Sequence, residues 1–236
     1  MPFLTADWRH ILLITYEVAP DRLAPYCPQG VEPEIARGGR AYCSLVAFDF
    51  LNTRVLGVKW PGHVNFPEFN LRFYVTSNGQ RGVVFVRELV PQPITCAMAR
   101  VLYNEPYSPA RFRRRLDREA GLIKYSHDVI LRGTTHHVSV EAEDAPFEPA
   151  PDSAEHFFKE QSWGFGQRRS GTPLAYRVDH PTWRVYPVRS WSSRVDWGAL
   201  YGPAWVDMAG AEPENVTFAE GSAVTVSPWR GLPGKA

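Results

Sequence analysis

One eleven-residue run of the chain alternates two kinds of side chain and so predicts a β-strand with two different faces. One face is apolar throughout and is expected to meet the core; it carries Pro67, Phe69, Leu71, Phe73 and Val75. The other face mixes an acid, an amide, a cation and a phenol with an aromatic ring: Phe66, Glu68, Asn70, Arg72 and Tyr74. This second face is too polar for a packed core and too aromatic for an ordinary solvated surface. The run is therefore predicted to form the wall of a pocket.

Composition excludes several classes of function. The chain has 236 residues, 44% hydrophobic and 22% charged, which is ordinary for a globular protein with a sizeable core. Its net charge of +1 offers no extended field for nucleic acid or an anionic membrane. No apolar run approaches the roughly 20 residues that a membrane-spanning helix needs. The N-terminus lacks the basic and long apolar regions of a secretion signal, and three cysteines without a CxxC pair fit reduced core residues. We therefore expect a cytoplasmic protein that binds neither nucleic acid nor membranes.

Proline and glycine punctuate the chain throughout. The 21 prolines and 18 glycines separate many short apolar segments, which is typical of one β-rich domain with a few helices. The Ser77-Asn-Gly-Gln80 run predicts a tight hairpin turn after the pocket-wall strand. We expect a single domain over residues 1–230 and a flexible tail over residues 231–236.

Alternation and capping signals place the individual elements. Strands are predicted at 10–18, 41–50, 65–75, 82–89, 122–131, 136–142, 174–178, 183–188 and 223–227. Helices are predicted at 20–26, 93–103 and 152–161. The last helix is expected to open with a capping box in which Asp152 is answered by Glu155.

Five segments of the chain resemble the bacterial YqjF-like proteins. They read LVAFDFLNTR at 45–54, NFPEFNLRFY at 65–74, GVVFVRE at 82–88, EHFFKEQSWGFG at 155–166 and EGSAVTVSPW at 220–229, so the resemblance covers nearly the whole chain. The resemblance implies the acetoacetate decarboxylase-like fold. In that mainly β (α+β) fold, a large antiparallel sheet curls into a cone-shaped barrel around a central cavity, with a few short helices. A closed barrel also leaves no exposed sheet edge.

The resemblance bears on chemistry through two missing lysines. Acetoacetate decarboxylase forms a Schiff base between a keto acid and a lysine amine, which an adjacent lysine helps to keep neutral. That lysine pair follows a helix and a proline. The same order here is the 93–103 helix and then Asn104-Glu-Pro-Tyr-Ser108, so Tyr107 and Ser108 stand where the lysines would be. Neither can form an imine, and the resemblance therefore implies that decarboxylase chemistry is lost at this position.

Lys159 is the best remaining candidate for an imine-forming catalytic amine. Within the predicted helix Glu155 stands four residues earlier, where its carboxylate would stabilise the ammonium form and oppose nucleophilic attack. A solvated ion pair between Glu155 and Lys159 is the favoured interpretation, and a lyase that uses Lys159 is the alternative.

Glu68 and Arg72 are the leading site candidates. The decarboxylase-like fold implies glutamates near the reacting centre, and Glu68 matches such a position. Arg72 lies on the same face, roughly 13 Å along the strand. It would clamp a ligand carboxylate or phosphate while Glu68 serves as acid, base or acceptor. An equally weighted alternative is a buried structural network of Glu68 and Arg72 with Arg87 and Glu88.

Further ligand-binding candidates surround this pair. Asn70, Tyr74 and Arg87 are assigned to the pocket from their strands. Asn104, Glu105 and Tyr107 form a second polar cluster at the predicted pocket mouth, although they also fit a plain helix exit and turn. Trp163 could cover the pocket, but core packing is the favoured interpretation for this ring.

Other motifs are missing from the sequence. It contains no HExxH, GxSxG, GxGxxG or phosphate-binding glycine loop, and adjacent His136 and His137 point to opposite faces of a strand. We therefore expect neither a metal nor a cofactor. The basic run 111–118 is predicted as a solvated face, and the eight tryptophans are compatible with a homo-oligomer.

The leading hypothesis is a central pocket that recognises a small acidic or carbonyl-bearing metabolite without a Schiff-base lysine, with conversion left open. One alternative is the decarboxylase or lyase that uses Lys159. Another is a non-enzymatic ligand carrier or an oligomeric interaction module.

Overall fold

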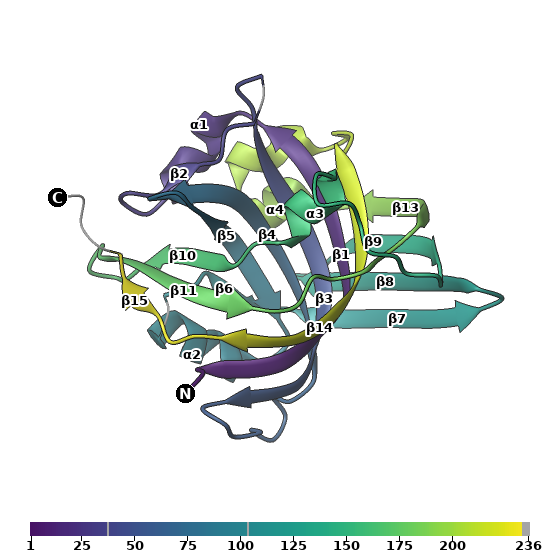
Figure 1. Cartoon of the computed structure of the whole chain (residues 1–236), viewed down its shortest axis with the longest axis horizontal. Helices are drawn as coiled ribbons and strands as arrows, with labels where there is room; N and C mark the ends of the chain where they lie inside the picture. The colour runs from purple at the N-terminus through teal and green to yellow at the C-terminus, as the bar shows by residue number, and fades with distance from the viewer. Residues whose placement is uncertain (37, 103, 233–236) are drawn as a thin grey trace.

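Seven strands follow one another around a closed ring in the computed structural model, which describes residues 1–36, 38–102 and 104–232 (Figure 1). In ring order they are β14 (Asn215–Val226), β1 (Leu4–Val18), β3 (Ala41–Val55), β4 (Phe66–Ser77), β5 (Gln80–Val90), β10 (Trp163–Gln167) and β11 (Pro173–Asp179). Pairing of Val178 with Val226 and of Asp179 with Thr225 joins β11 back to β14 and closes the barrel. Closure satisfies the backbone groups of strands that would otherwise be sheet edges.

Four short strands extend this ring. They are β2 (Glu32–Pro33) on β4, β6 (Tyr107–Pro109) on β5, β12 (Val185–Tyr186) on β14 and β15 (Arg230–Gly231) on β11. The long neighbouring strands pair antiparallel, whereas β5 pairs in parallel with both β10 and β6. Between β4 and β5, Asn78 and Gly79 both adopt positive φ, as the predicted hairpin turn requires.

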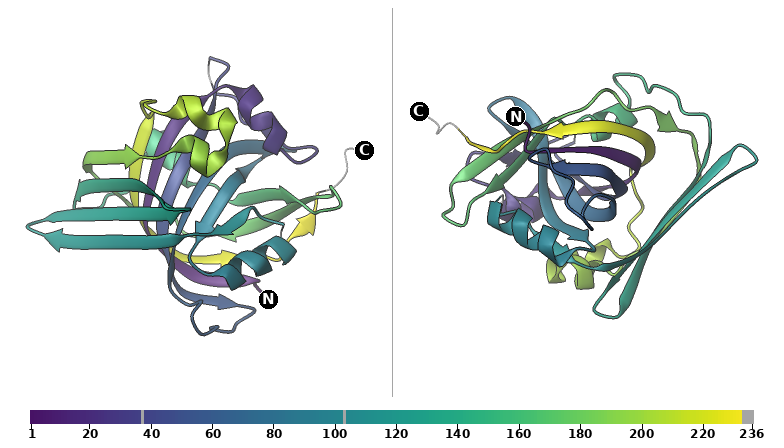
Figure 2. Two further views of the ribbon diagram at one scale, coloured as in Figure 1. Left: turned by 180° about the vertical axis from the view of Figure 1, so that it is seen from behind. Right: turned by 90° about the horizontal axis from the view of Figure 1, so that it is seen from below.

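A second sheet of four antiparallel strands packs against the outside of the barrel. Its order is β13 (Val188–Arg194), β9 (Thr134–Glu143), β8 (Leu122–Leu131) and β7 (Arg111–Glu119). The β7–β8 hairpin extends well beyond the barrel, as seen from both sides in Figures 1 and 2. A buried carboxylate joins the sheets: Asp49 of β3 accepts from Arg114 Nε of β7 at 2.6 Å and lies 3.0 Å from His10 Nδ1 of β1.

Short helices cover the openings and the outer face. They are α1 (Pro20–Leu23), the 3₁₀ turn η1 (Ala24–Tyr26), α2 (Pro93–Leu102), α3 (Ala154–Lys159), α4 (Trp197–Tyr201) and the 3₁₀ turn η2 (Pro203–Met208). Asp196 caps α4, because its Oδ1 accepts from the Ala199 amide at 2.9 Å. Within the described ranges, no helix is long and apolar enough to cross a membrane.

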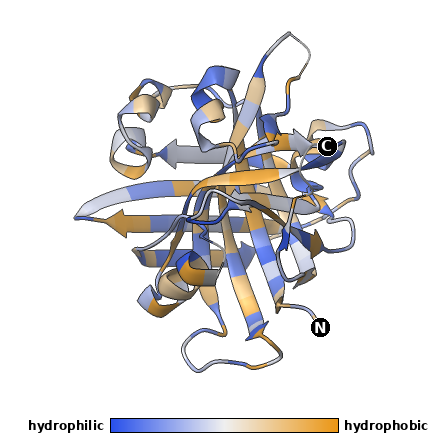
Figure 3. Ribbon diagram, turned by 90° about the vertical axis from the view of Figure 1, so that its left-hand side faces the viewer, coloured by the Kyte–Doolittle hydropathy of each residue, from blue (hydrophilic) through white to orange (hydrophobic). Residues whose placement is uncertain are grey.

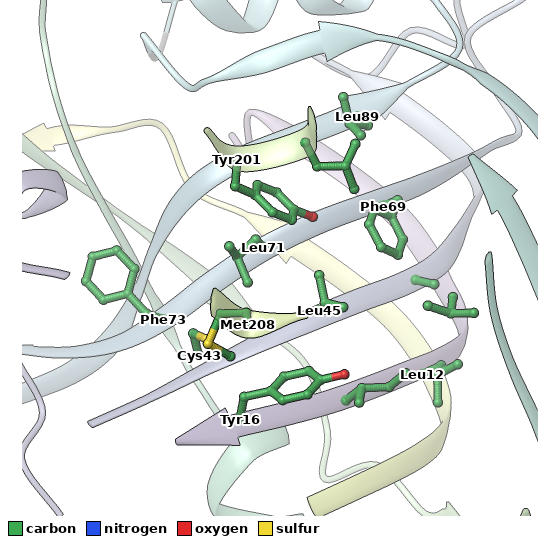
Figure 4. Packing of buried hydrophobic residues seen from close by; sticks show 14 of the residues in the cluster. Leu12, Tyr16, Cys43, Leu45, Phe69, Leu71, Phe73, Leu89, Tyr201 and Met208 are labelled. Atoms are coloured by element: carbon green, nitrogen blue, oxygen red, sulfur yellow. The ribbon is translucent and has the colours of Figure 1, made fainter. Parts of the chain in front are cut away.

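The two faces of the barrel wall bury two separate groups of side chains. The outward face of β4 carries Phe69, Leu71 and Phe73, which pack with β1, β3, β5 and the α4–η2 segment (Figure 4). The inward face carries Phe66 and Tyr74 with their neighbours inside the barrel. Apolar and polar residues accordingly alternate along the strands in Figure 3. The predicted division of this strand into a core face and an interior face is confirmed.

The mainly β, decarboxylase-like barrel class expected from the resemblance is confirmed, and several boundaries are corrected. The strand predicted at 223–227 begins at Asn215, and Gly221 lies within it, paired with Arg9. A Cβ on Gly221 would lie 2.0 Å from the Trp8 carbonyl oxygen, and its φ is +78°. The 183–188 strand is split into β12 and β13.

The helix predicted at 152–161 is shorter than expected. It spans only Ala154–Lys159, and its cap is Ser153, whose Oγ accepts from the His156 amide, rather than the predicted Asp152. In the predicted tail, Gly231 belongs to β15 and is paired with Leu174, so the tail does not begin there. Residues 233–236 of that tail, and Tyr103 at the predicted end of the 93–103 helix, lie outside the described residues.

Candidate functional site

A cavity of about 560 Å³ fills the interior of the barrel. Every one of the seven ring strands contributes a lining residue, from Trp8 of β1 to Val226 of β14. Helix α2 and the segment 56–64 border the cavity where it meets solvent, since Ile94, Met98 and Trp60 line it and are also exposed. The cavity has the size and concavity of a small-molecule site.

Glu68 lies at the centre of the polar part of this cavity. Its carboxylate accepts from Asn70 Nδ2 at 2.8 Å and from the Tyr107 hydroxyl at 3.0 Å, and it is 2% exposed. Strand alternation places Glu68 and Asn70 on one face of β4, as predicted. Tyr107 reaches the same point because β6 adds to β5 directly after α2.

Two further glutamates line the same cavity. The pairing of Asn70 with Glu88 and of Glu88 with Tyr107 forms one row across β4, β5 and β6. Glu105, just before β6, completes the group, and its carboxyl is hydrogen-bonded to the side chain of Tyr176 on β11. Three buried carboxyl groups thus share one largely apolar chamber.

Burial raises the pKa of each of these carboxyls. Loss of hydration raises the pKa of Glu68 to about 7, although hydrogen bonds from Asn70 and Tyr107 and the nearby Arg72 oppose the shift. Desolvation likewise raises the pKa of Glu105 to about 8, and the pKa of Glu88 lies well above its ordinary value through burial and its two acidic neighbours. At neutral pH the cluster therefore holds protons.

Several buried polar atoms on the cavity wall have no hydrogen-bond partner within the described part of the chain. They are Asn70 Oδ1, Arg72 Nε, Glu88 Oε2, Glu105 Oε1 and Gln161 Oε1. Arg72 is anchored at its other end, where Nη2 donates to the Phe158 carbonyl at 3.0 Å. Because unpartnered buried polar groups are costly, these atoms are positioned to meet a ligand or ordered water.

Arg87 is a correction to the predicted site. Strict alternation from Val83 and Phe85 would point it inward, but the pairing with β4 skips Val86 at a bulge, so alternation reverses. Glu88 consequently faces the cavity, and Arg87 faces outward, where Nη1 donates to the Leu200 carbonyl at 2.5 Å. The predicted network of Glu68, Arg72, Arg87 and Glu88 is therefore wrong for Arg87, which lies outside the cavity.

Tyr74 and Asn104 also lie away from the cavity. Tyr74 points into the barrel but is covered by α3, and its hydroxyl contacts Ser44 Oγ at 2.6 Å and the Phe158 carbonyl at 3.3 Å. Asn104 has a positive φ of 54°, and its Nδ2 donates to the Gln167 carbonyl at 2.7 Å, which fits the turn interpretation.

Lys159, the alternative catalytic amine, is buried at 1% exposure and forms an ion pair with its neighbour Glu160. The predicted solvated pair with Glu155 is wrong, because the Lys159 side chain is buried and its amine contacts Glu160 instead. None of the lysines that the structure describes lines the cavity. Trp163 does line it, and the Arg230 guanidinium lies 4.6 Å from the centre of its ring.

Sequence reasoning missed Tyr176, Gln161 and the aromatic wall of Trp8, Phe48 and Phe50. The signal for Phe48 and Phe50 was available, because they alternate along the 45–54 segment. No sequence signal placed β11 opposite Glu105. Across residues 1–36, 38–102 and 104–232, no group of three or more His, Cys, Asp or Glu residues is arranged to hold a metal ion.

Comparison with known proteins identifies the family. The model of DUF2071, described as an uncharacterized conserved protein, matches residues 5–223. The chain belongs to the DUF2071 family. A curated relative is the uncharacterized protein YqjF of Bacillus subtilis (strain 168), 26% identical over 157 residues. That match covers 65% of this chain and 63% of YqjF, so it spans less than two thirds of the relative's length.

Solved structures place this DUF2071 member in the acetoacetate decarboxylase-like fold. An acetoacetate decarboxylase-like enzyme from Sphingomonas wittichii RW1 aligns with a TM-score of 0.68 at 13% identity, over 99% of this chain and 94% of that one. The enduracididine biosynthesis enzyme MppR, complexed with the condensation product of pyruvate and imidazole 4-carboxaldehyde, aligns at 0.67 and 15% identity, over 100% and 92%. Acetoacetate decarboxylase from Legionella pneumophila aligns at 0.63 and 12% identity, over 99% and 88%. At these identities the likeness shows the fold alone.

Proposed function

We propose that the barrel cavity binds a carbonyl-bearing or acidic metabolite and transfers a proton at the carbon next to its carbonyl group, without a lysine imine. The observation that carries this proposal is the cluster of three buried carboxyls, two of which have a pKa of about 7 and about 8, in a chamber without a described lysine. Groups that exchange protons near neutral pH are suited to general acid–base catalysis.

The surroundings of each carboxyl assign roles within the cluster. Glu68 acts as the base, because it accepts from Asn70 and Tyr107 and lies near Arg72, all of which favour its carboxylate. Glu105 and Glu88, whose pKa values burial raises, act as protonated hydrogen-bond donors. In the proposed step the ligand's C–H bond breaks and an O–H bond forms on Glu68. The electron pair moves to the carbonyl oxygen, where a neutral carboxyl donates to the resulting enolate. Return of the proton to carbon restores Glu68, so no other reactant is required.

Arg72 supplies the recognition of an acidic group. Its Nη2 donates to the Phe158 carbonyl, while Nε is buried and has no partner among the described residues, so the guanidinium is held in place with this donor unused. A ligand carboxylate or a polarised carbonyl would satisfy that donor. The relatives favour the same ligand chemistry, since MppR was solved with pyruvate bound.

The alternative lyase is disfavoured because Lys159 is buried outside the cavity and paired with Glu160. A charged, paired ammonium is a poor nucleophile.

Proton exchange provides the test. The protein is incubated in D₂O with a panel of 2-oxo acids and methyl ketones, and loss of the proton signal next to the carbonyl is followed by NMR. We expect exchange with the wild type, a loss of about 100-fold or more for Glu68→Gln, and weaker binding for Arg72→Ala. Glu143→Gln is the matched control, because Glu143 is an exposed carboxylate of the second sheet.

Two results would overturn the proposal. Binding without exchange would leave a ligand carrier rather than an enzyme. The absence of both binding and exchange across the panel would show that the cavity does not bind this class of carbonyl compounds.

A further inference from the structure

The cavity opens through a rim of exposed apolar side chains. Trp60, Ile94 and Met98 line the cavity and are nevertheless 51%, 61% and 40% exposed. The two sides of the rim are joined, because His63 Nδ1 lies 2.8 Å from Thr95 Oγ1 and Gln92 donates to the Gly62 carbonyl at 3.2 Å. Hydrocarbon exposed at the mouth of a cavity marks a place where an apolar group is covered on binding.

An aromatic wall continues inward from this rim. Phe66, at the start of β4 where the 56–64 segment leads in, stacks on Phe50 with ring centres 4.8 Å apart. Trp8 packs edge-on against Phe48 and Phe50 at 5.3 Å and 5.5 Å. All four rings line the cavity. Glu68 follows Phe66 by two residues on the same face, so the apolar wall leads from the rim to the carboxyl cluster.

The chamber is larger than a short keto acid would fill. A volume of about 560 Å³ lies in the range of pockets that hold drug-sized ligands, whereas a keto acid of a few carbons would leave most of the aromatic wall uncovered. The carboxyl and guanidinium groups of the lining belong to the carboxyl cluster and Arg72, whereas the aromatic wall and the rim contribute the smaller polar groups of Thr53, His63 and Thr95. The chamber therefore has one polar region and one long hydrocarbon region.

We infer that the ligand is amphipathic: a carbonyl or carboxyl head at Glu68 and Arg72, carried on a hydrocarbon body that runs along the aromatic wall and leaves between α2 and the 56–64 segment. This inference rests on the proposed function for the head and adds the class of the body. Burial of each further methylene against the wall strengthens binding until the chain reaches the rim, after which the gain per carbon declines.

A chain-length series tests the body separately from the head. Straight-chain 2-oxo acids from about four to about twelve carbons are titrated by calorimetry below their micelle concentrations. We expect Kd to fall by about fourfold per methylene over the first part of the series and then to level off.

Substitutions at the rim test where the hydrocarbon chain of the ligand leaves the cavity. Met98→Glu and Ile94→Glu place a charge where the chain leaves, and both residues are exposed, so the fold is retained. We expect each to weaken the long acids at least tenfold while the shortest acid is unchanged. Val101→Glu is the control, since Val101 is a 74% exposed residue of the same helix that does not line the cavity.

The outcomes separate the two proposals. Equal affinity for short and long acids overturns the amphipathic ligand and leaves the proposed function standing, whereas no binding at any length overturns the proposed function. A rim that instead holds a second copy of this chain would give a dimer in solution that Met98→Glu dissociates without changing the affinity for long acids. That result also overturns the inference.

Discussion

The Tyr107 hydroxyl donates a 3.0 Å hydrogen bond to the Glu68 carboxylate, from a position where the resemblance to acetoacetate decarboxylase implies a lysine. The phenol carries no charge, so its hydrogen bond and the nearby Arg72 only partly oppose the effect of burial on Glu68. Burial then dominates and raises the pKa of Glu68 to about 7. Glu68 is therefore suited to exchange its proton near neutral pH.

Tyr107→Phe is therefore expected to raise the pKa of Glu68 further, because the hydrogen bond from Tyr107 lowers it. The measurement is a ¹³C NMR titration of the glutamate carboxyls, with the pH profile of proton exchange as a second readout. Tyr26→Phe is the control: its hydroxyl accepts from Trp205 Nε1 at 3.0 Å, outside the cavity. An unchanged Glu68 titration in Tyr107→Phe would show that this hydrogen bond does not set the pKa.

Stability should fall as the pH rises through the titration range of the carboxyl cluster. The folded pKa values of about 7 for Glu68 and about 8 for Glu105 exceed the ordinary value of 4.5, so the folded state binds these protons more tightly than the unfolded state. The stabilisation is complete below about pH 4.5 and is lost as the pH rises through about 7 to 8. Buried His127, whose folded pKa of about 4 lies below its ordinary value of 6.5, opposes this trend only below about pH 7.

Urea unfolding at pH values from 6 to about 9 measures this dependence. We expect the free energy of unfolding to decline with pH in the wild type and to decline less in Glu105→Gln, which cannot ionise. A wild-type curve that is flat over this range would contradict the raised pKa values.

Gly164 allows Tyr176 to reach the carboxyl cluster. A Cβ at this position would lie 2.2 Å from Tyr176 Cζ, so Gly164→Ala must displace the tyrosine ring. We expect a loss of about 1–3 kcal/mol of stability from overpacking.

We also expect Gly164→Ala to give a higher pKa for Glu105, because its hydrogen bond from Tyr176 lowers that pKa. Gly166→Ala on the same strand is the control for stability, since its Cβ would meet Leu174 at 3.5 Å and Glu105 Oε1 at 3.6 Å, both ordinary contacts. Equal effects of the two substitutions would contradict this role.

Lys159 should remain unmodified when 2-oxo acids are trapped with borohydride. Its ammonium is buried and paired with Glu160, and no described lysine faces the ligand chamber. Mass spectrometry of tryptic peptides reads the result, and Lys124, an exposed lysine paired with Glu141, reports background reactivity. A larger fraction of adduct on Lys159 than on Lys124 would support the alternative function, a lyase that uses Lys159.

Much of the pocket wall was predictable because alternation along a strand is local. Phe66, Glu68, Asn70 and Arg72 line the cavity in the order that a two-residue period requires, and their opposite neighbours fill the outer core. The same rule misplaced Arg87, since the bulge at Val86 is invisible in the sequence and reverses every following side chain.

Long-range closure was not predictable from the residues alone. Tyr176 reaches Glu105 only because β10 and β11 continue the ring and β11 pairs with β14. Residues of separate strands give no periodic signal of their mutual distance, and the family resemblance supplied the barrel without its register. Likewise, β7 was not predicted as a strand, because only Phe112 and Leu116 interrupt its run of charged residues and give no regular alternation. Both side chains pack against the outer core.

Asp49 is the final test, because it holds the second sheet against the barrel. Its buried carboxylate accepts from Arg114 Nε at 2.6 Å and faces His10 Nδ1 at 3.0 Å. Asp49→Ala leaves Arg114 without its counter-ion, and since a third of that arginine is solvated we expect a cost of about 2–3 kcal/mol, below the value for a fully buried pair. Glu143→Ala, which breaks the exposed pair with Arg189, should cost no more than about 0.5 kcal/mol.

Amide exchange in β7 and β8 should accelerate in Asp49→Ala, because the hairpin loses its polar link to β3. If Asp49→Ala and Arg114→Ala prove additive in the double variant, the ion pair does not join the two sheets.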